Sequence, residues 1–188
     1  SWVGEEGVEA VAILSIDDMR DTARYENYLR PILDRLKAID GRAPVSIFTC
    51  QVDPKDMQLQ RWLKEGLSIE VHTISHPCPL LGAGGSLADA RATVHNCIDL
   101  LAGIPNSFPV IFRMPCCDSQ NSLSPRFFSE IFSKPTAVGN RLKADSSVFT
   151  LLSTPGNRLE KYVLKLRGFV NYIKDYPYPY VVGGNCWE

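Results

Sequence analysis

Two histidines, His72 and His76, are separated by three residues, so both imidazoles can reach one ion from a single turn of chain. They come directly after a short apolar run that indicates a strand, and Asp17 and Asp18 end an earlier one. A carboxylate from that earlier strand would complete a three-ligand site, which leaves coordination positions for water and substrate. The pattern therefore predicts a catalytic metal centre.

A divalent metal held in this way can polarise a carbonyl group and lower the pKa of bound water. A second carboxylate nearby can take the proton of that water as a general base, so Asp17 and Asp18 can supply one base and one ligand. Taken separately, an Asp-Asp pair is usually a solvated loop, and an isolated H-x-x-x-H is more often accidental. The prediction depends on their order and on the predicted strand before each of them.

The elements that must position these residues are short apolar strands alternating with amphipathic helices. This alternation predicts an α/β fold with a parallel sheet or barrel, in which the carboxyl ends of the strands meet on one face. We expect strands at 11–14, leading into 15–18, and at 45–49, 67–71, 110–112, 147–152 and 180–182. We expect helices at 28–39, 56–65 and 86–101, a short one opening at Ser124-Pro125, and another between the last two strands.

Several residues are typical of helix ends. Ser86, with Asp89 three residues later, has the pattern of an N-cap. Gly66 and Gly103 follow apolar periodicity and are expected to end their helices. Pro31 predicts either the first turn of its helix or a kink.

Four segments resemble motifs of the polysaccharide deacetylases, the carbohydrate esterases with a NodB homology domain. Residues 15–18, S-I-D-D, resemble the family's T-F-D-D motif, and residues 72–77, H-T-I-S-H-P, fit its H-[ST]-x-x-H-P motif in full. Residues 113–115, R-M-P, resemble its R-x-P motif, and residues 145–149, D-S-S-V-F, are a weaker likeness to a fourth motif. The histidine motif is the specific one, and the likeness runs from about residue 10 to 150.

This resemblance implies one domain over residues 1–188, folded as a distorted (β/α) barrel that is incomplete at its C-terminal end. It implies a divalent metal, usually zinc, bound by Asp18, His72 and His76. The reaction would remove acyl groups, N-acetyl or O-acetyl, from a carbohydrate polymer or a related acylated small molecule.

The resemblance also implies roles for residues around the metal. Asp17 would be the general base and Arg113 would hold it, while Asp145 would orient Arg113. The backbone N–H of Cys116 would help to stabilise the oxyanion.

The chain departs from the family at the residue that would act as general acid. The fifth family motif contains a leucine and an acid histidine, but the only histidine besides His72 and His76 is His95. His95 lies beside the apolar stripe of a predicted helix, so we interpret it as a packing or surface residue. The chain is also shorter than the roughly 250 residues of a closed barrel. We expect a fragment whose acid lies downstream of Glu188; the alternative is a non-catalytic relative that binds metal and glycan.

Two smaller departures accompany the missing acid. Met19 replaces the glycine that commonly follows the two aspartates, and Val148 stands where the fourth motif often has a second aspartate.

A different class of enzyme, the non-haem iron oxygenases, also uses two histidines and a carboxylate as metal ligands. However, those enzymes usually place a histidine close to the carboxylate in sequence, on an antiparallel β fold.

The composition limits the remaining classes. A net charge of −1 gives no attraction to nucleic acid, and no apolar run approaches the roughly 18 residues of a membrane span. The six cysteines form no C-x-x-C pair, so we interpret them as mostly buried free thiols, with disulfides permitted.

The tyrosines at 176, 178 and 180 are expected to lie in an extended segment that leads to the next strand, with their rings packed on the surface and not stacked on sugars. The compartment stays open, although the resemblance slightly favours secretion or the cell envelope.

Overall fold

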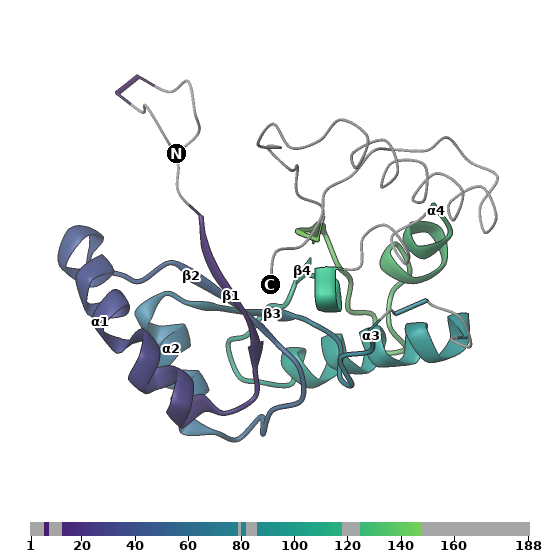
Figure 1. The fold of residues 1–188 in the computed structure, drawn as a ribbon, viewed down its shortest axis with the longest axis horizontal. Helices are drawn as coiled ribbons and strands as arrows, with labels where there is room; N and C mark the ends of the chain where they lie inside the picture. Colours follow the sequence, from purple (N-terminus) through teal and green to yellow (C-terminus); the bar gives the residue numbers. More distant parts are fainter. Residues whose placement is uncertain (1–5, 8–12, 79, 82–85, 118–124, 148–188) are drawn as a thin grey trace, which may run out of the picture.

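The structure, a computed structural model, describes residues 6–7, 13–78, 80–81, 86–117 and 125–147. They form the predicted α/β fold around one parallel sheet of five strands in the order β1-β2-β3-β4-β5 (Figure 1). The strands are β1 (Leu14–Met19), β2 (Val45–Thr49), β3 (Ser68–Val71), β4 (Ile111–Phe112) and β5 (Ala144–Asp145). The helical elements are α1 (Thr22–Asp40), α2 (Met57–Glu65), α3 (Leu87–Ala102), α4 (Pro125–Phe127), a 3-10 turn η1 (Pro115–Cys117) and a π-turn η2 (Phe128–Phe132).

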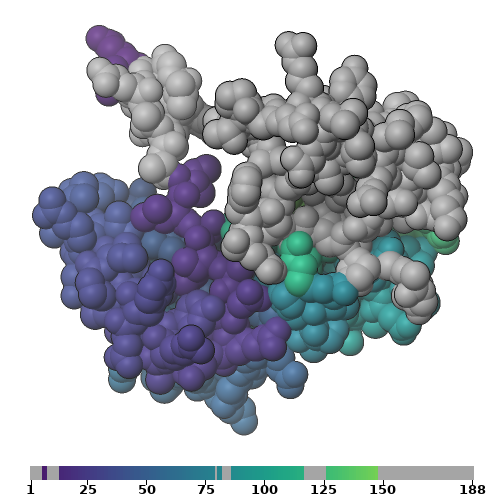
Figure 2. All heavy atoms as spheres, in the orientation of Figure 1, coloured from purple at the N-terminus to yellow at the C-terminus, as the bar shows by residue number. Residues whose placement is uncertain are grey.

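The strand order equals the chain order, which is the arrangement expected of a barrel-type sheet. Leu33 of α1, Trp62 of α2 and Ile98 of α3 belong to one hydrophobic core, as expected when right-handed crossovers bring the connecting helices to the same side of the sheet. Figure 2 shows the purple and blue residues of the first half on one side of the molecule and the teal residues on the other. Among the described residues the sheet is open, because no pairing joins β1 to β5.

Most predicted elements are confirmed, and the differences have local causes. The helix predicted from residue 28 begins at Thr22, because the Asp21 side chain accepts a hydrogen bond from the Arg24 N–H at 3.0 Å. Pro31 therefore lies inside α1 instead of in its first turn. The last described strand, β5, lies at Ala144–Asp145, before the strand predicted at 147–152, and Ser147 itself is not in a strand. The predictions beyond Ser147, including the last strand, the helix before it and the three tyrosines, lie outside the described residues.

The predicted helix ends are confirmed at the two helices that flank β3. Ser86 caps α3 by accepting a hydrogen bond from the Asp89 N–H at 3.0 Å and donating to the Asp89 carboxylate at 2.7 Å. Gly66 ends α2 with a φ of 101°, a left-handed conformation that glycine adopts without a steric penalty. No helix of the described segments combines the length and hydrophobicity that a membrane span requires.

The two faces of the sheet have different chemistry, because successive side chains of a strand point to opposite sides. Ile47 and Ile69 belong to the hydrophobic core together with Leu33 and Trp62 of the helices. The alternate positions on these strands are polar or aromatic: the Ser68 hydroxyl donates to the Ser46 hydroxyl at 3.1 Å, followed by Phe48 on β2 and Glu70 on β3. The inner face therefore carries a column of side chains that leads towards the carboxyl ends of the strands.

Glu70 is a buried carboxyl that anchors the start of β4. Its Oε2 accepts hydrogen bonds from the Val110 and Ile111 N–H groups at 2.9 and 2.8 Å, and the residue is only 3% exposed. β4 has two residues, and its register with β3 rests on one pair, Val71 with Phe112. Glu70 therefore supplies much of the hydrogen bonding that places the segment leading to Arg113.

Burial raises the pKa of Glu70 above its ordinary value of 4.5, although the two N–H donors act in the opposite direction. The folded state therefore binds this proton more tightly than the unfolded chain does. The resulting stabilisation is fully present below about pH 4.5 and is lost as the pH rises through the raised pKa.

A Glu70→Gln variant should show this linkage directly, since the amide keeps an oxygen acceptor but does not titrate. The free energy of unfolding of the wild type minus that of Glu70→Gln should be largest at about pH 4 and should fall towards about pH 8. Urea unfolding of both proteins across this range measures the difference. A difference that is constant or that rises with pH would contradict the assigned environment of Glu70.

Candidate metal centre and active site

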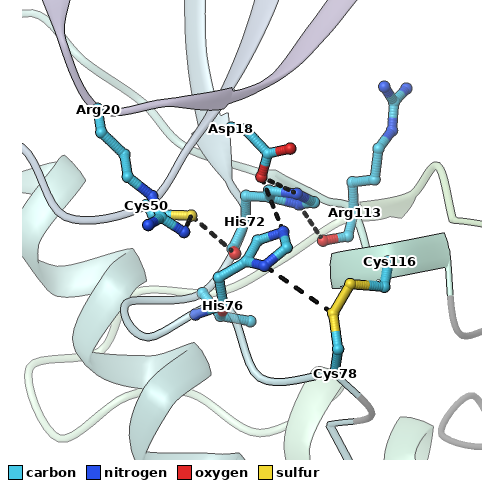
Figure 3. The surroundings of a disulfide bond; sticks show 9 residues. Asp18, Arg20, Cys50, His72, His76, Cys78, Arg113 and Cys116 are labelled. Carbon is cyan, nitrogen blue, oxygen red and sulfur yellow. Dashed lines mark hydrogen bonds and ion pairs between the residues drawn. A yellow bond between two sulfur atoms is a disulfide. The ribbon is translucent and has the colours of Figure 1, made fainter. Parts of the chain in front are cut away.

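The three predicted metal ligands converge at the carboxyl ends of β1 and β3 (Figure 3). Asp18 Oδ1 lies 2.7 Å from His76 Nε2 and 3.4 Å from His72 Nε2, and the ligand atoms all lie within 4.8 Å of one another. Ligands about 2.1 Å from a tetrahedral ion are separated by roughly 3.4 Å, so this spacing suits a single small cation.

The chemistry of the donor atoms also fits a divalent metal. His72 Nδ1 lies 2.8 Å from the Arg113 carbonyl oxygen, which accepts a hydrogen bond and therefore assigns the proton to Nδ1. The lone pair of His72 Nε2 is then directed towards Asp18. His76 Nε2 is buried and has no properly aligned hydrogen bond, despite its short separation from Asp18. Two imidazole nitrogens and one carboxylate are a donor set that binds zinc and similar ions.

Burial also prepares His72 for this role. The residue is 2% exposed, and its removal from water lowers the pKa of the imidazole below its usual value. A lowered pKa favours the neutral ring, which is the form that ligates a metal.

The chain turns sharply at Asp18 and in the turn that carries His76. The register of β1 against β2 shifts between Ile16 and Met19, and Asp18, inside this bulge, has a φ of 60°. A bulge re-aims side chains, so the adjacent carboxylates of Asp17 and Asp18 take different directions. In the turn after β3, Thr73 and His76 have φ values of 66° and 51°. These left-handed conformations are costly for residues other than glycine and are held by surrounding contacts.

Hydrogen bonds from α3 hold the turn that carries His76. The Thr93 hydroxyl of α3 accepts the N–H groups of Ile74 and Ser75, both at 3.2 Å. Within the turn, the Thr73 hydroxyl accepts the His76 N–H at 3.1 Å. The position of the second histidine therefore depends on the packing of α3 against β3.

Arg113 holds the carboxylate that lies next to the metal ligands. Its Nη1 donates to Asp17 Oδ1 at 2.7 Å, and its Nη2 and Nε donate to the hydroxyls of Ser15 and Ser146 at 3.0 and 3.1 Å. The guanidinium carbon lies 4.1 Å from the centre of the Phe48 ring. The structure therefore brings Asp17 and Arg113 together, as the sequence predicts.

Sequence reasoning missed Ser15 and Ser146 as partners of Arg113. The signal for Ser15 was its spacing of two from Asp17, which puts both side chains on the same face of β1. Ser146 follows β5, and its proximity to Arg113 depends on the pairing of β5 with β4, which no local pattern reveals.

Asp145, predicted to orient Arg113, accepts its hydrogen bonds from Ser147, through the N–H at 3.2 Å and the hydroxyl at 2.6 Å. The Ser147 hydroxyl in turn accepts the Met114 N–H at 2.6 Å. Burial raises the pKa of Asp145, which the Ser147 hydrogen bonds and the nearby Arg113 charge partly offset. A direct orienting role for Asp145 therefore stays a prediction. Its hydrogen bonds connect it through Ser147 to Met114, the residue after Arg113.

The interpretation of the cysteines as free thiols is wrong for two of them. Cys78 and Cys116 form a disulfide with their Cα atoms 5.9 Å apart (Figure 3). They are 38 residues apart in sequence, and they meet because the loops after β3 and β4 leave the same end of the sheet. Cys50 and Cys97 are buried free thiols, as predicted, and burial raises the pKa of Cys97 to about 12.

The third histidine lies apart from the ligands, on α3. His95 Nε2 is 3.1 Å from the carbonyl oxygen of Ile131, where α3 packs against η2. This contact agrees with the interpretation of His95 as a packing residue.

A cleft of about 720 Å³ opens beside the carboxylates. It lies between the end of β1, the first turns of α1 and the His76 turn. The Tyr25 hydroxyl, on its wall, donates to the Asp17 carbonyl oxygen at 2.8 Å, and Tyr28 is 68% exposed. The lining residues are Ile16, Asp17, Asp18, Arg20, Asp21, Arg24, Tyr25, Tyr28 and His76.

A family model for polysaccharide deacetylases matches residues 4–125, which is more than half of the chain. The chain therefore belongs to the polysaccharide deacetylase family, whose members are metal-dependent. No curated protein matches the chain.

Several solved structures are similar to this chain. The Streptococcus pyogenes deacetylase PplD in complex with acetate is 19% identical over 58% of this chain and 48% of its own, with a TM-score of 0.47. A family 4 carbohydrate esterase from Streptomyces lividans, also with acetate, is 16% identical over 57% of this chain and 52% of its own, with a TM-score of 0.42. The Bacillus subtilis peptidoglycan deacetylase PdaC is 16% identical over 87% and 96%, with a TM-score of 0.42. The chain thus spans about half the length of the first two.

The ligand assignment predicts the metal content of variants. His72→Ala or His76→Ala should abolish stoichiometric zinc binding, because each removes one of three donor atoms that lie within 4.8 Å of one another. Elemental analysis after zinc loading and dialysis measures the content, and His95→Ala, which changes a histidine outside the cluster, is the control. Equal zinc in the wild type and in both ligand variants would rule out this site.

Proposed function

We propose that this chain is a zinc-dependent hydrolase domain that removes N-acetyl or O-acetyl groups from a polysaccharide or a related acylated substrate. One observation carries the proposal. The carboxylate of Asp17, fixed by Arg113 at 2.7 Å, adjoins a cluster of Asp18, His72 and His76 with the donor set of a catalytic zinc site.

Zinc bound by these three residues would polarise the acyl carbonyl and acidify water in the site. Asp17 then takes the proton of the attacking water as general base. Its Oδ1 bonds Arg113, so its second oxygen remains to accept the proton. The guanidinium of Arg113 fixes the direction of the carboxylate through this hydrogen bond.

Stabilisation of the oxyanion is assigned to the backbone N–H of Cys116. Backbone donors act most strongly where negative charge develops in the transition state. Cys116 follows the R-M-P segment in the turn η1 and has a φ of 53°. This places the donor in the loop after β4, at the same end of the sheet as the His76 turn.

The cleft next to Asp17 has the composition expected of a carbohydrate site. Tyr25 and Tyr28 supply aromatic surface, and Arg20 and Arg24 supply hydrogen-bond donors. We assign the sugar ring that carries the acyl group to this cleft.

A second candidate is a non-catalytic relative that binds metal and glycan. It is favoured by the position of His95, which lies on α3 and contacts the carbonyl oxygen of Ile131 on η2. None of the three histidines is therefore placed to act as general acid beside Asp17. The two candidates differ in turnover but share the metal site.

The proposal predicts that this 188-residue chain alone is a poor catalyst, because a positioned general acid typically contributes about 10²–10⁴-fold. Acetate release from acetylated chitooligosaccharides or acetylxylan should be much slower for this chain than for one extended beyond Glu188 with a segment that supplies an acid histidine. Equal turnover by both, surviving His95→Ala, would show that the acid lies within these residues or is not needed. The absence of turnover in both would favour the non-catalytic candidate.

Asp17→Asn, made in the more active of these two chains, should retain zinc and lose about 10²–10⁴-fold in kcat. The amide oxygen can still accept the Arg113 hydrogen bond, so the fold is kept while the base is removed. Zinc content and kcat are measured on the same preparation. Full activity in the zinc-loaded variant would remove Asp17 from the role of base.

A further inference from the structure

We propose that the Cys78–Cys116 disulfide is a positioning element of the active site, which holds the oxyanion donor of Cys116 in place against the His76 turn. This inference rests on the function proposed above. The bond joins the residue two positions after His76 to the residue three positions after Arg113. It thus links the loop of a metal ligand to the loop of the oxyanion donor.

The disulfide lies against one of the proposed metal ligands, His76. Cys78 Sγ is 3.9 Å from His76 Nδ1, while Nε2 of the same ring is directed at Asp18 (Figure 3). The bond therefore approaches the ligand cluster from the side opposite β1, where the imidazole separates it from Asp18.

The backbone on both sides of the bond is in a conformation that needs external support. His76 and Cys116 have φ values of 51° and 53°, in the left-handed region that residues with a Cβ rarely adopt. Such conformations cost on the order of 1–3 kcal/mol each and persist where surrounding contacts determine them. Loss of the bond would leave the Cys116 turn freer to relax.

Among the described residues, no strand pairing reaches Cys116. β4 pairs with β3 at one position and with β5 at two, but it ends at Phe112, four residues before Cys116. The Met114 N–H bonds the Ser147 hydroxyl at 2.6 Å, and the disulfide is a covalent tie two residues later. An oxyanion donor is effective only within about 2.7–3.1 Å of the developing charge, so a small drift of this loop is costly.

The mechanism predicts a particular kinetic effect. Complete loss of one oxyanion donor costs about 10²–10³-fold in kcat. Breaking the disulfide loosens the donor without deleting it, so we expect kcat to fall about tenfold or more. KM should change little, because the interaction is made in the transition state.

The test compares the oxidised, zinc-loaded wild type with Cys78→Ser and with the wild type treated with a water-soluble phosphine. The phosphine and one water reduce the S–S bond to two thiols and yield the phosphine oxide. Phosphine added to Cys78→Ser is the control for the reagent, and Cys97→Ala is the control for loss of a cysteine outside the disulfide. If Cys78→Ser fails to fold, the reduced wild type supplies the same comparison.

Three readouts are followed: the linked peptides of Cys78 and Cys116 by mass spectrometry, the zinc content, and the Cys116 amide resonance during acetate titration. Acetate, the product of the proposed reaction, serves as the probe of the oxyanion position, and selective ¹⁵N-cysteine labelling makes the amide visible. We expect acetate to shift this resonance in the oxidised wild type and in Cys97→Ala. The shift should be reduced in Cys78→Ser and in the reduced wild type, with zinc retained.

The proposal is overturned if the two cysteines are not linked, or if zinc-loaded Cys78→Ser keeps both the acetate response and kcat. Loss of zinc from Cys78→Ser would also overturn it, since the bond would then support the ligand and not the oxyanion donor. Absence of acetate release from the oxidised wild type and from the longer chain counts against the proposed function instead. In that case the acetate response of the amide still decides whether the disulfide positions Cys116.

Discussion

The arrangement of the site depends on one side chain, the guanidinium of Arg113. A cation that is only 20% exposed is tolerated when its hydrogen bonds and charge are matched, and here the partners come from Asp17, Ser15 and Ser146. These residues lie on β1 and directly after β5, while the Phe48 ring beneath the guanidinium belongs to β2. One residue following β4 thus joins strands that are far apart in sequence, and removal of it would leave the Asp17 carboxylate without its main partner.

The same residue acts through its backbone. The Arg113 carbonyl accepts the hydrogen bond of His72, which sets the tautomer of a predicted metal ligand, while the side chain holds the proposed base. The relative position of base and ligand is therefore determined by the conformation of a single residue. Glu70 supports this arrangement, because its carboxyl group accepts the N–H groups of Val110, just before β4, and of Ile111, the first residue of β4. The polar column on the inner face of the sheet is stable because its buried members have partners.

The elements and the convergence of Asp18, His72 and His76 were predictable because their signals are local. Apolar periodicity, the Ser86 cap and the spacing of His72 and His76 are properties of short segments, and parallel α/β topology then brings strand ends together. The disulfide and the contacts of Ser146 were not predictable, because they depend on which loops meet across the sheet. Asp18 is an intermediate case: its prediction as a ligand followed from the motif, whereas the bulge that aims its side chain depends on the pairing of β1 with β2.

Four of the five described non-glycine residues with positive φ surround the site: Asp18, Thr73, His76 and Cys116, the fifth being Asn106. For anyone wishing to make the protein more heat-resistant, these positions are the obvious places to relieve backbone strain with glycine. At Asp18 and His76 the exchange would delete a donor atom, and at Cys116 it would delete the cross-link. At Thr73 it would remove the hydroxyl that accepts the His76 N–H. Thermal robustness in this protein therefore has to be gained at a distance, on the helices and outer loops, and not where the chain is most strained.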